Sequence, residues 1–354
     1  MKAIRWHARG DVRYEELPEP SPGPSQVKAK IHYSGICGSD LHEYEAGPIF
    51  IPVTPHPMTG SMPPLTLGHE FSGRVVEVGE GVTNLKVGDR VTGDCVWSCG
   101  KCYYCMRNKP CLCVIAAYTG LHVDGCMAEY LVAPDYTFYK LPDSVSDELG
   151  ALTEPLEVAF HAVRQGKVQV GDTVAIVGAG PIGCCTILAA KAAGASRVYV
   201  SEYSKGRREM AMAIGATAVI DPASDDAVKA IWNLTDGLGA DVTFDCVGHR
   251  DSPIFAIRFA RKGGTVVIVG IFSEESPKMH FNYVVFGERT IVGSSGYARE
   301  APFILEMMAD RRIDPRRLIT GKIQLKDTVE KGFKELLKNK DKHLKILIES
   351  PNWS

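Results

Sequence analysis

The segment Gly35–His42 places four chemically active side chains within eight residues. It carries the thiol of Cys37, the hydroxyl of Ser39, the carboxylate of Asp40 and the imidazole of His42. The glycines that flank the thiol would let backbone and substrate approach it closely. A thiolate beside groups that can accept and pass on protons suits an enzyme site that contains a metal.

Two later segments add side chains that bind metals, Gly68–Glu70 and Glu154–Glu157. Cysteine, histidine and glutamate supply the sulfur, nitrogen and oxygen ligands of zinc enzymes. We expect Cys37, His69 and Glu154 to hold one catalytic zinc, with a fourth position open. Considered singly, Cys37 would also suit a small buried apolar site, and His69 a hydrogen-bonded core position. The hypothesis therefore depends on the combination.

Five of the eleven cysteines lie within fifteen residues. In an intracellular chain, such crowding indicates metal binding rather than disulfides. The spacing C-x2-C-x2-C-x7-C suits a closed tetrahedral zinc site of structural type. Its candidate ligands are Cys99, Cys102, Cys105 and Cys113. Cys111 competes for the fourth place, and a ferredoxin-type iron–sulfur cluster would need a cysteine where Lys109 stands.

A glycine-rich turn at Gly178–Gly183 follows the apolar run Thr173–Val177 and precedes an alanine-rich stretch. Strand, turn and helix in this order predict a dinucleotide site, with the pyrophosphate at the helix N-terminus. Glu202 would accept hydrogen bonds from the adenosine ribose and repel a 2′-phosphate, which favours NAD. Arg208 and its neighbour Arg207 keep NADP open as an alternative. The candidate coenzyme-binding residues are Gly178, Gly180, Pro181, Ile182, Gly183, Glu202 and Arg207.

The pattern of expected secondary structure changes near Gly171. Before it, short β-rich runs are punctuated by proline and glycine; after it, strands alternate with helices, which predicts a doubly wound parallel sheet. We expect a mostly β catalytic domain at 1–155, completed by 296–354, and a dinucleotide-binding domain at 156–295. The proline-rich segment 47–64 is expected to be a surface loop beside the site.

Composition narrows the function classes. The 354 residues carry a formal net charge of −2, with no basic clustering around Cys99–Cys113, so neither nucleic acid nor anionic membrane is expected as a partner. The N-terminus lacks the apolar core of a signal peptide, and no apolar run is long enough to span a bilayer. We therefore expect a soluble cytoplasmic protein.

Together these motifs resemble the zinc-containing medium-chain alcohol/polyol dehydrogenases over essentially the whole length. Gly68–Glu70 resembles the zinc-histidine signature of that family, and Val87–Val91 its strand-turn motif. The resemblance implies an α/β protein with a GroES-like catalytic domain and a Rossmann domain. It also favours Cys113 over Cys111, and it implies two zinc ions per subunit, NAD, and a homodimer or homotetramer.

Some residues of this sequence differ from those usual in alcohol dehydrogenases, and these differences suggest one branch of the family. Where alcohol dehydrogenases often have a zinc-binding cysteine, this sequence has Glu154 in Glu-Pro-Leu. The sorbitol, threonine and butanediol dehydrogenase branches also have a glutamate there. In the polyol branch Glu70 can also lie on the metal, so the choice between Glu70 and Glu154 stays open. The segment Gly47–Pro52 with His56-Pro57 resembles the long loop of 2,3-butanediol dehydrogenases. The expected reaction is therefore the interconversion of 2,3-butanediol and acetoin, with sorbitol/polyol or L-threonine oxidation as alternatives.

The resemblance also implies roles for the first segment. Ser39 would start a proton relay that continues through the nicotinamide ribose to His42, while Asp40 would orient a zinc-binding histidine. Hydride would pass between the carbinol carbon and the nicotinamide. The rival from another class is a nucleotide-sensing zinc protein without a catalytic metal. It would hold one zinc ion per chain, whereas the enzyme would hold two.

Overall fold

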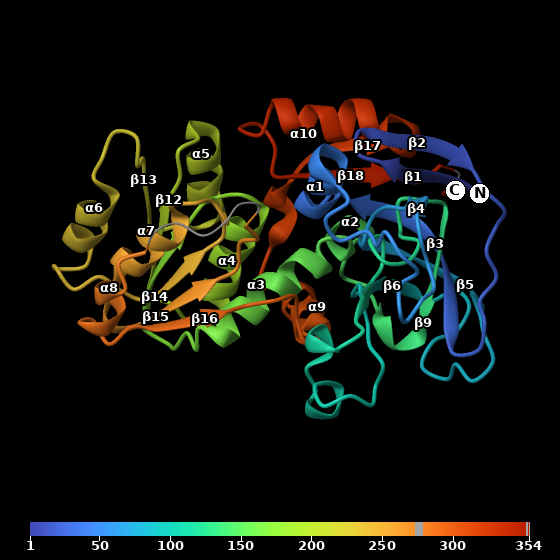
Figure 1. Cartoon of the computed structure of the whole chain (residues 1–354), viewed down its shortest axis with the longest axis horizontal. Coiled ribbons are helices and arrows are strands. Elements are labelled where there is room, and N and C mark those ends of the chain that lie inside the picture. The colour runs from blue at the N-terminus through green and yellow to red at the C-terminus, as the bar shows by residue number, and fades with distance from the viewer. Residues whose placement is uncertain (273–278, 352, 354) are drawn as a thin grey trace. The chain divides into compact units, whose positions relative to one another are not determined.

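The structure, a computed structural model, describes residues 1–272, 279–351 and 353. The chain divides into two compact units, and most of their elements are labelled in Figure 1. The first unit comprises Met1–Glu154, Ala298–Arg311 and Ile319–Ser354. The second comprises Pro155–Tyr297 and Arg312–Leu318. Each unit is described by itself.

A seven-stranded sheet forms the centre of the first unit. Its strands are β3 (Gln26–Gly35), β5 (Glu70–Val78), β6 (Arg90–Gly93), β9 (Tyr130–Pro134), β10 (Phe138–Lys140), β17 (Ile319–Gln324) and β18 (Lys345–Glu349). They run in the order β10-β6-β5-β3-β18-β17, and β9 also pairs with β3. The core on this sheet includes Val27, Ile31 and Phe71. Strands from both ends of the chain thus meet at β3, from which the first segment of the site continues.

Smaller elements complete this unit. A three-stranded sheet contains β1 (Lys2–Ala8), β2 (Asp11–Glu16) and β4 (Leu65–Thr66), and a two-stranded one contains β7 (Val96–Trp97) and β8 (Ala117–Tyr118). The helices are α1 (Gly38–Ala46), α2 (Asp147–Gly150), α9 (Ala301–Ala309), a π-helix (Thr328–Phe333) and α10 (Lys334–Lys338). Sequence patterns do not identify β1, β2 or α1. Residues 47–64 contain turns but neither helix nor strand, as expected.

The second unit contains six parallel strands in the order β13-β12-β11-β14-β15-β16. They are β11 (Thr173–Val177), β12 (Arg197–Ser201), β13 (Ala218–Ile220), β14 (Ala240–Asp245), β15 (Ala260–Ile268) and β16 (Thr290–Gly293). All five residues of β11 are buried, as a central strand of a parallel sheet requires. The expected α/β fold is confirmed. β15 begins at Ala260, before the apolar run 265–270, because an irregular register lets Ala260 pair with Ala240.

Helix α3 (Thr153–Gln165) precedes β11 along the chain. The helices that connect the strands are α4 (Pro181–Ala192), α5 (Lys205–Ile214), α6 (Ala227–Leu234), α7 (Ser252–Phe259) and α8 (Asn282–Val285). α7 buries Ala256, Ile257 and Phe259 in the core of this unit. Among the helices of the described residues, none combines the length and hydropathy needed to cross a bilayer.

Candidate functional site

Helix α1 fixes the first segment of the site. Cys37 is the extended residue directly before the helix, and its backbone N–H donates to the Asp40 carboxylate at 2.9 Å. A carboxylate in the first turn satisfies a backbone donor and suits the positive end of the helix dipole. Asp40 is fully buried, Ser39 is half-buried and His42 is exposed. One short helix thus turns Cys37 and Asp40 inward and His42 toward solvent.

Three side chains converge: Cys37 directly before α1, His69 directly before β5, and Glu70 at the start of β5. One ligand atom each of Cys37, His69 and Glu70 lies within 4.8 Å of the other two. His69 is 4% exposed and Glu70 is fully buried. The Ser39 hydroxyl lies 3.3 Å from Nε2 of His69, and Oδ1 of Asp40 lies 3.9 Å from its Nδ1. Sulfur, nitrogen and oxygen donors thus surround one buried point.

The electrostatics of this cluster favour a cation. Burial opposes protonation of His69, but the negative charges of Cys37 and Asp40 outweigh it and raise the pKa of His69 well above its usual value. Burial also raises the pKa of Asp40. Oε2 of Glu70 is buried without a hydrogen-bond partner among the described residues, and Nδ1 of His69 faces Oδ1 of Asp40, which leaves Nε2 of His69 as the nitrogen for a metal. Since a buried acceptor left unpaired is costly, the Glu70 oxygen fits a metal ion.

Glu154 lies at the start of α3 but is not part of the three-residue cluster. It is 6% exposed, and its Oε1 lies 3.9 Å from the sulfur of Cys95. Its negative charge contributes to the raised pKa of His69. The structure therefore brings Glu70 together with Cys37 and His69, and leaves Glu154 as a buried carboxylate that acts on the same histidine.

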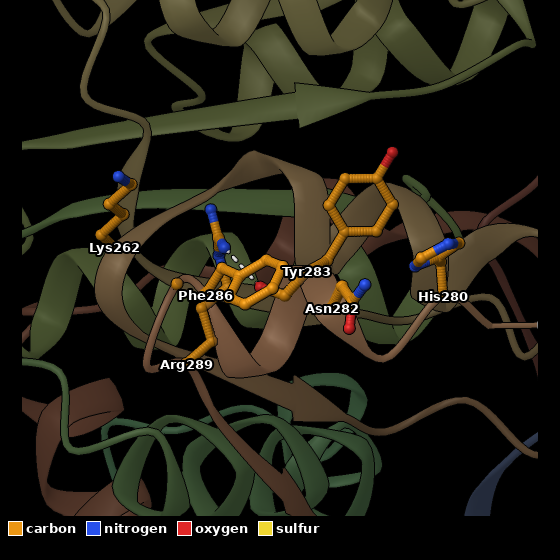
Figure 2. A pocket seen from close by; sticks show the side chains of 7 residues that line it. Lys262, His280, Asn282, Tyr283, Phe286 and Arg289 are labelled. Carbon is orange, nitrogen blue, oxygen red and sulfur yellow. Dashed lines mark hydrogen bonds between the residues drawn. The ribbon is translucent and has the colours of Figure 1, made fainter.

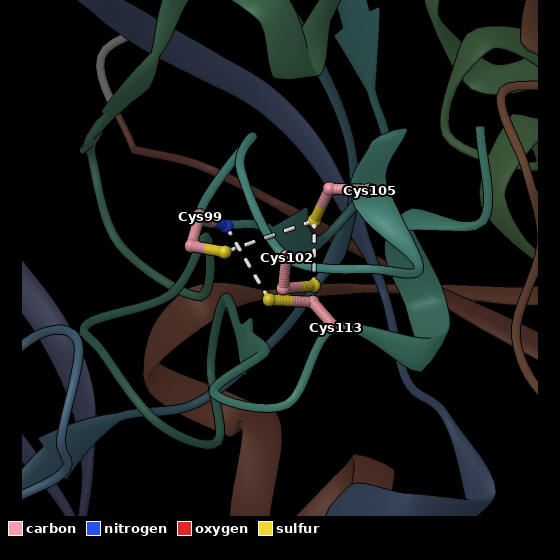
Figure 3. Close-up of side chains that lie close together, drawn as sticks. All are labelled: Cys99, Cys102, Cys105 and Cys113. Atoms are coloured by element: carbon pink, nitrogen blue, oxygen red, sulfur yellow. Dashed lines mark hydrogen bonds between the residues drawn. The ribbon is translucent and has the colours of Figure 1, made fainter. Parts of the chain in front are cut away.

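The second candidate metal site lies in the loop after β7. Sulfur atoms of Cys99, Cys102, Cys105 and Cys113 all lie within 4.8 Å of one another (Figure 3). Four thiolates at about 2.3 Å from one zinc ion would be about 3.8 Å apart. The sulfur of Cys105 lies 3.5 Å from that of Cys102 and 3.9 Å from that of Cys99. The spacing therefore fits a tetrahedral site.

Backbone N–H groups in this loop stabilise a thiolate, the form of cysteine that binds a cation. Hydrogen bonds from backbone N–H groups, first that of Cys105 and then that of Val114, lower the pKa of Cys102 to about 6. Burial raises the pKa of Cys105 to about 11, so the four thiols do not all ionise at neutral pH without a positive charge among them. Cys111 is buried outside the group of four. All eleven cysteines are free of disulfides.

The glycine turn in the second unit joins β11 to α4. Gly178 has φ +92°, which side chains other than glycine rarely adopt, and a Cβ on Gly183 would lie 2.0 Å from the Gly178 carbonyl oxygen. Gly180 caps α4, with Pro181 and Ile182 as its first two residues. The nearest atom to a Cβ on Gly180 would be an Arg207 nitrogen, 3.8 Å away. The N-terminus of α4 is therefore approachable by an anion.

Glu202 follows β12 and lies against this turn. Its carboxylate accepts hydrogen bonds from the backbone N–H groups of Ala179 and Ser204, both at 2.8 Å. Arg208 is bound to Asp221 at 2.8 Å and donates to the Glu202 carbonyl oxygen. Arg207, rather than Arg208, thus lies beside the glycine turn.

Comparison with known proteins identifies the family. The model of the zinc-binding dehydrogenases matches residues 181–310, and that of the alcohol dehydrogenase GroES-like domain matches residues 23–143. The (R,R)-butanediol dehydrogenase of Bacillus subtilis is 43% identical over 99% of this chain and 100% of its own. The chain belongs to the zinc-binding dehydrogenase family. A sorbitol dehydrogenase of Halalkalibacterium halodurans is 36% identical over 90% of this chain and 92% of its own.

Solved structures agree with this dehydrogenase fold. The crystal structure of the Bacillus subtilis 2R,3R-butanediol dehydrogenase has a TM-score of 0.92 at 42% identity, covering 99% of each chain. A structure from Sinorhizobium meliloti 1021, with a TM-score of 0.90 at 32% identity, is bound to NADP and covers 98% of each chain. An alcohol dehydrogenase of Escherichia coli CFT073 contains NADH, with a TM-score of 0.89, 28% identity and 99% of each chain covered. The protein is a zinc-dependent alcohol dehydrogenase that uses a nicotinamide coenzyme.

The buried contacts of two residues of this dehydrogenase cannot be predicted from the sequence. Lys345 on β18 donates to Glu70, its partner across 275 positions of the chain. Glu43 on α1 is fully buried and accepts backbone N–H groups from residues 49–51. Glu43 lies only four residues from Ser39, but an acidic residue followed by a loop carries no distinctive pattern. Lys345 gives no local signal at all.

Proposed function

We propose that this dehydrogenase interconverts 2,3-butanediol and acetoin with NAD(H). The observation that carries the proposal is the full-length match to the butanediol dehydrogenase of Bacillus subtilis, in sequence and in fold. Glu202 supports NAD because its carboxylate stands where an added 2′-phosphate would be repelled.

We propose that Cys37, His69 and Glu70 hold the catalytic zinc, with Glu154 as the alternative carboxylate. Zinc there would lower the pKa of an alcohol and polarise a ketone. Asp40 orients His69 from its other side, and Ser39 and the exposed His42 carry the proton between substrate and solvent. Zinc content of Glu70→Gln and Glu154→Gln decides between the carboxylates, since the variant that lacks a ligand should retain less metal.

A substrate panel tests the reaction. Purified protein should reduce acetoin with NADH at least tenfold faster than it oxidises sorbitol, and chiral analysis of the product should give a single stereoisomer. The sorbitol dehydrogenases among the relatives make sorbitol the second candidate. Faster oxidation of sorbitol would refute the butanediol proposal and leave the family assignment intact.

We further propose that Cys99, Cys102, Cys105 and Cys113 hold a structural zinc. Substitution of Cys113 by serine should lower the metal content from two zinc ions per chain to one. Cys111→Ser is the matched control, because Cys111 is buried in the same loop but outside the group of four. Equal metal loss in both variants would contradict this ligand set.

We propose that the protein is a homo-oligomer assembled through the surface around α8 and β16. β16 lies at one edge of its sheet, and large apolar residues nearby are exposed: Phe281, Tyr283, Val285, Phe286 and Ile291. Figure 2 shows Tyr283 and Phe286 at a hollow of about 360 Å³ on this surface. An exposed strand edge beside an apolar patch invites association, and a twofold axis lets one patch pair with its own copy.

The oligomeric state tests this surface. Wild-type protein should run as a dimer or tetramer in size-exclusion chromatography with light scattering. Phe286→Asp, which places a charge on the patch, should shift it toward monomer. Leu238→Asp is the control, because Leu238 is also exposed but belongs to the loop before β14. A monomeric wild type would refute the proposal.

A further inference from the structure

Lys345 is a buried cation that contacts the metal cluster. It is the first residue of β18 and is 3% exposed. Its ammonium donates to Oε1 of Glu70 at 2.6 Å and to the carbonyl oxygen of Ile36 at 2.9 Å. Ile36 directly precedes Cys37. One side chain therefore touches both a candidate ligand and the peptide group beside another.

The sheet explains how residues so far apart in sequence meet. β3 lies between β5 and β18, and its Gly35 pairs with Glu70 on one side and with Leu347 on the other. A Cβ on Gly35 would lie 2.0 Å from Oε2 of Glu70. The absence of a side chain at Gly35 thus makes room for the Glu70 carboxylate, and Lys345 holds that carboxylate from β18.

A buried ammonium is costly unless it is paired and hydrogen-bonded. Here its partner is the carboxylate of Glu70, which is itself fully buried. Because Lys345 occupies Oε1, only Oε2 of Glu70 is left without a hydrogen-bond partner among the described residues.

We propose that Lys345 is a positioning residue of the metal centre. By holding Oε1, it presents Glu70 to the metal through Oε2 alone, and by holding the Ile36 carbonyl it fixes the backbone that carries Cys37. This inference rests on the metal site proposed above, with Glu70 as one of its donors. Residues that hold a metal ligand from behind typically change metal affinity ten- to hundredfold when replaced.

Cobalt substitution tests the role without any substrate. Cobalt(II) placed in the catalytic site, with zinc left in the four-cysteine site, has an absorption spectrum that depends on ligand number and geometry. Lys345→Met frees Oε1, so the cobalt bands should change and metal loss to a chelator should be at least tenfold faster. Lys345→Arg retains a cation able to bridge both oxygens and should restore both properties toward wild type.

Lys322→Met is the matched control, because Lys322 lies on the neighbouring strand β17 and pairs with Glu148 at the surface. It should match wild type in spectrum and in metal loss. Where Lys345→Met does not fold, Lys345→Gln takes its place: it removes the charge, keeps a shorter polar donor and should change the spectrum and the rate of metal loss in the same direction. A folded Lys345→Met, or Lys345→Gln in its place, with the wild-type spectrum and rate of metal loss would overturn the proposal.

The outcomes separate this inference from the proposed function. Failure to reduce acetoin would refute the substrate and leave the spectra as expected. Failure of wild-type protein to bind cobalt outside the four-cysteine site would refute the metal site itself, whatever the variants show.

Discussion

At the scale of single residues, Glu202 has the clearest testable role. Its carboxylate lies against the glycine turn, where two backbone N–H groups at 2.8 Å fix its direction. A hydrogen bond to a charged group contributes about 1.5–3 kcal/mol. Glu202→Ala should therefore lower kcat/KM for NAD about tenfold or more and raise that for NADP, because repulsion of the 2′-phosphate is removed.

Steady-state kinetics with both coenzymes measure this change. Glu209→Ala is the control, since Glu209 is an exposed carboxylate on helix α5, the next element after Glu202. An unchanged ratio of NAD to NADP efficiency in Glu202→Ala would show that another group selects the coenzyme.

Residue types and spacing predict part of the site. Cysteine clusters and glycine turns depend on short distances along the chain, so their spacing predicts a cysteine metal site but leaves Cys111 and Cys113 as alternatives for its fourth ligand. The contact between Lys345 and Glu70 spans 275 positions and follows only from the order of strands. The same limit explains why the sequence leaves Glu70 and Glu154 as alternatives, since both are glutamates beside other motifs.

At the scale of elements, Glu43 ties the end of α1 to the loop that follows. Its buried carboxylate accepts N–H groups of Ile49, Phe50 and Ile51 at 2.5–3.2 Å. Glu43→Gln replaces one acceptor oxygen by an amide group that faces these donors. Leaving a buried donor unpaired costs about 1–3 kcal/mol, so the melting temperature should fall and the amides of residues 49–51 should exchange faster.

Hydrogen exchange with peptide-level resolution and thermal unfolding measure both effects. Glu45→Gln on the exposed part of α1 should change neither. Exchange at residues 49–51 that equals wild type in Glu43→Gln would show that the loop is held by its other contacts.

Elements differ in how well sequence predicts them. β11 is a continuous apolar run that a buried parallel strand requires, and it is found where expected. The helix α1 is short and contains two fully buried acidic residues, Asp40 and Glu43. Because the buried residues are polar, no apolar pattern in the sequence indicates which side of the helix is buried. Its stability comes from capping and from the loop contacts, which no hydrophobic period reveals.

At the scale of the whole molecule, the two chemistries belong to different units. Both candidate metal clusters lie within Met1–Glu154, whereas the coenzyme turn and Glu202 lie within Pro155–Tyr297. Compact units with their own cores can keep their folds when the other is perturbed. Removal of zinc by a chelator at neutral pH should therefore abolish turnover but leave the dissociation constant for NADH within about threefold of its starting value.

Fluorescence titration of NADH before and after chelation, with metal counting on the same samples, measures the separation. Glu202→Ala provides the reciprocal case, because it should keep both zinc ions and bind NADH more weakly. Loss of NADH binding in step with zinc would mean that the second unit depends on the metal-bearing one for its fold. Retained binding at zero zinc would instead show that binding of NADH does not require the metal.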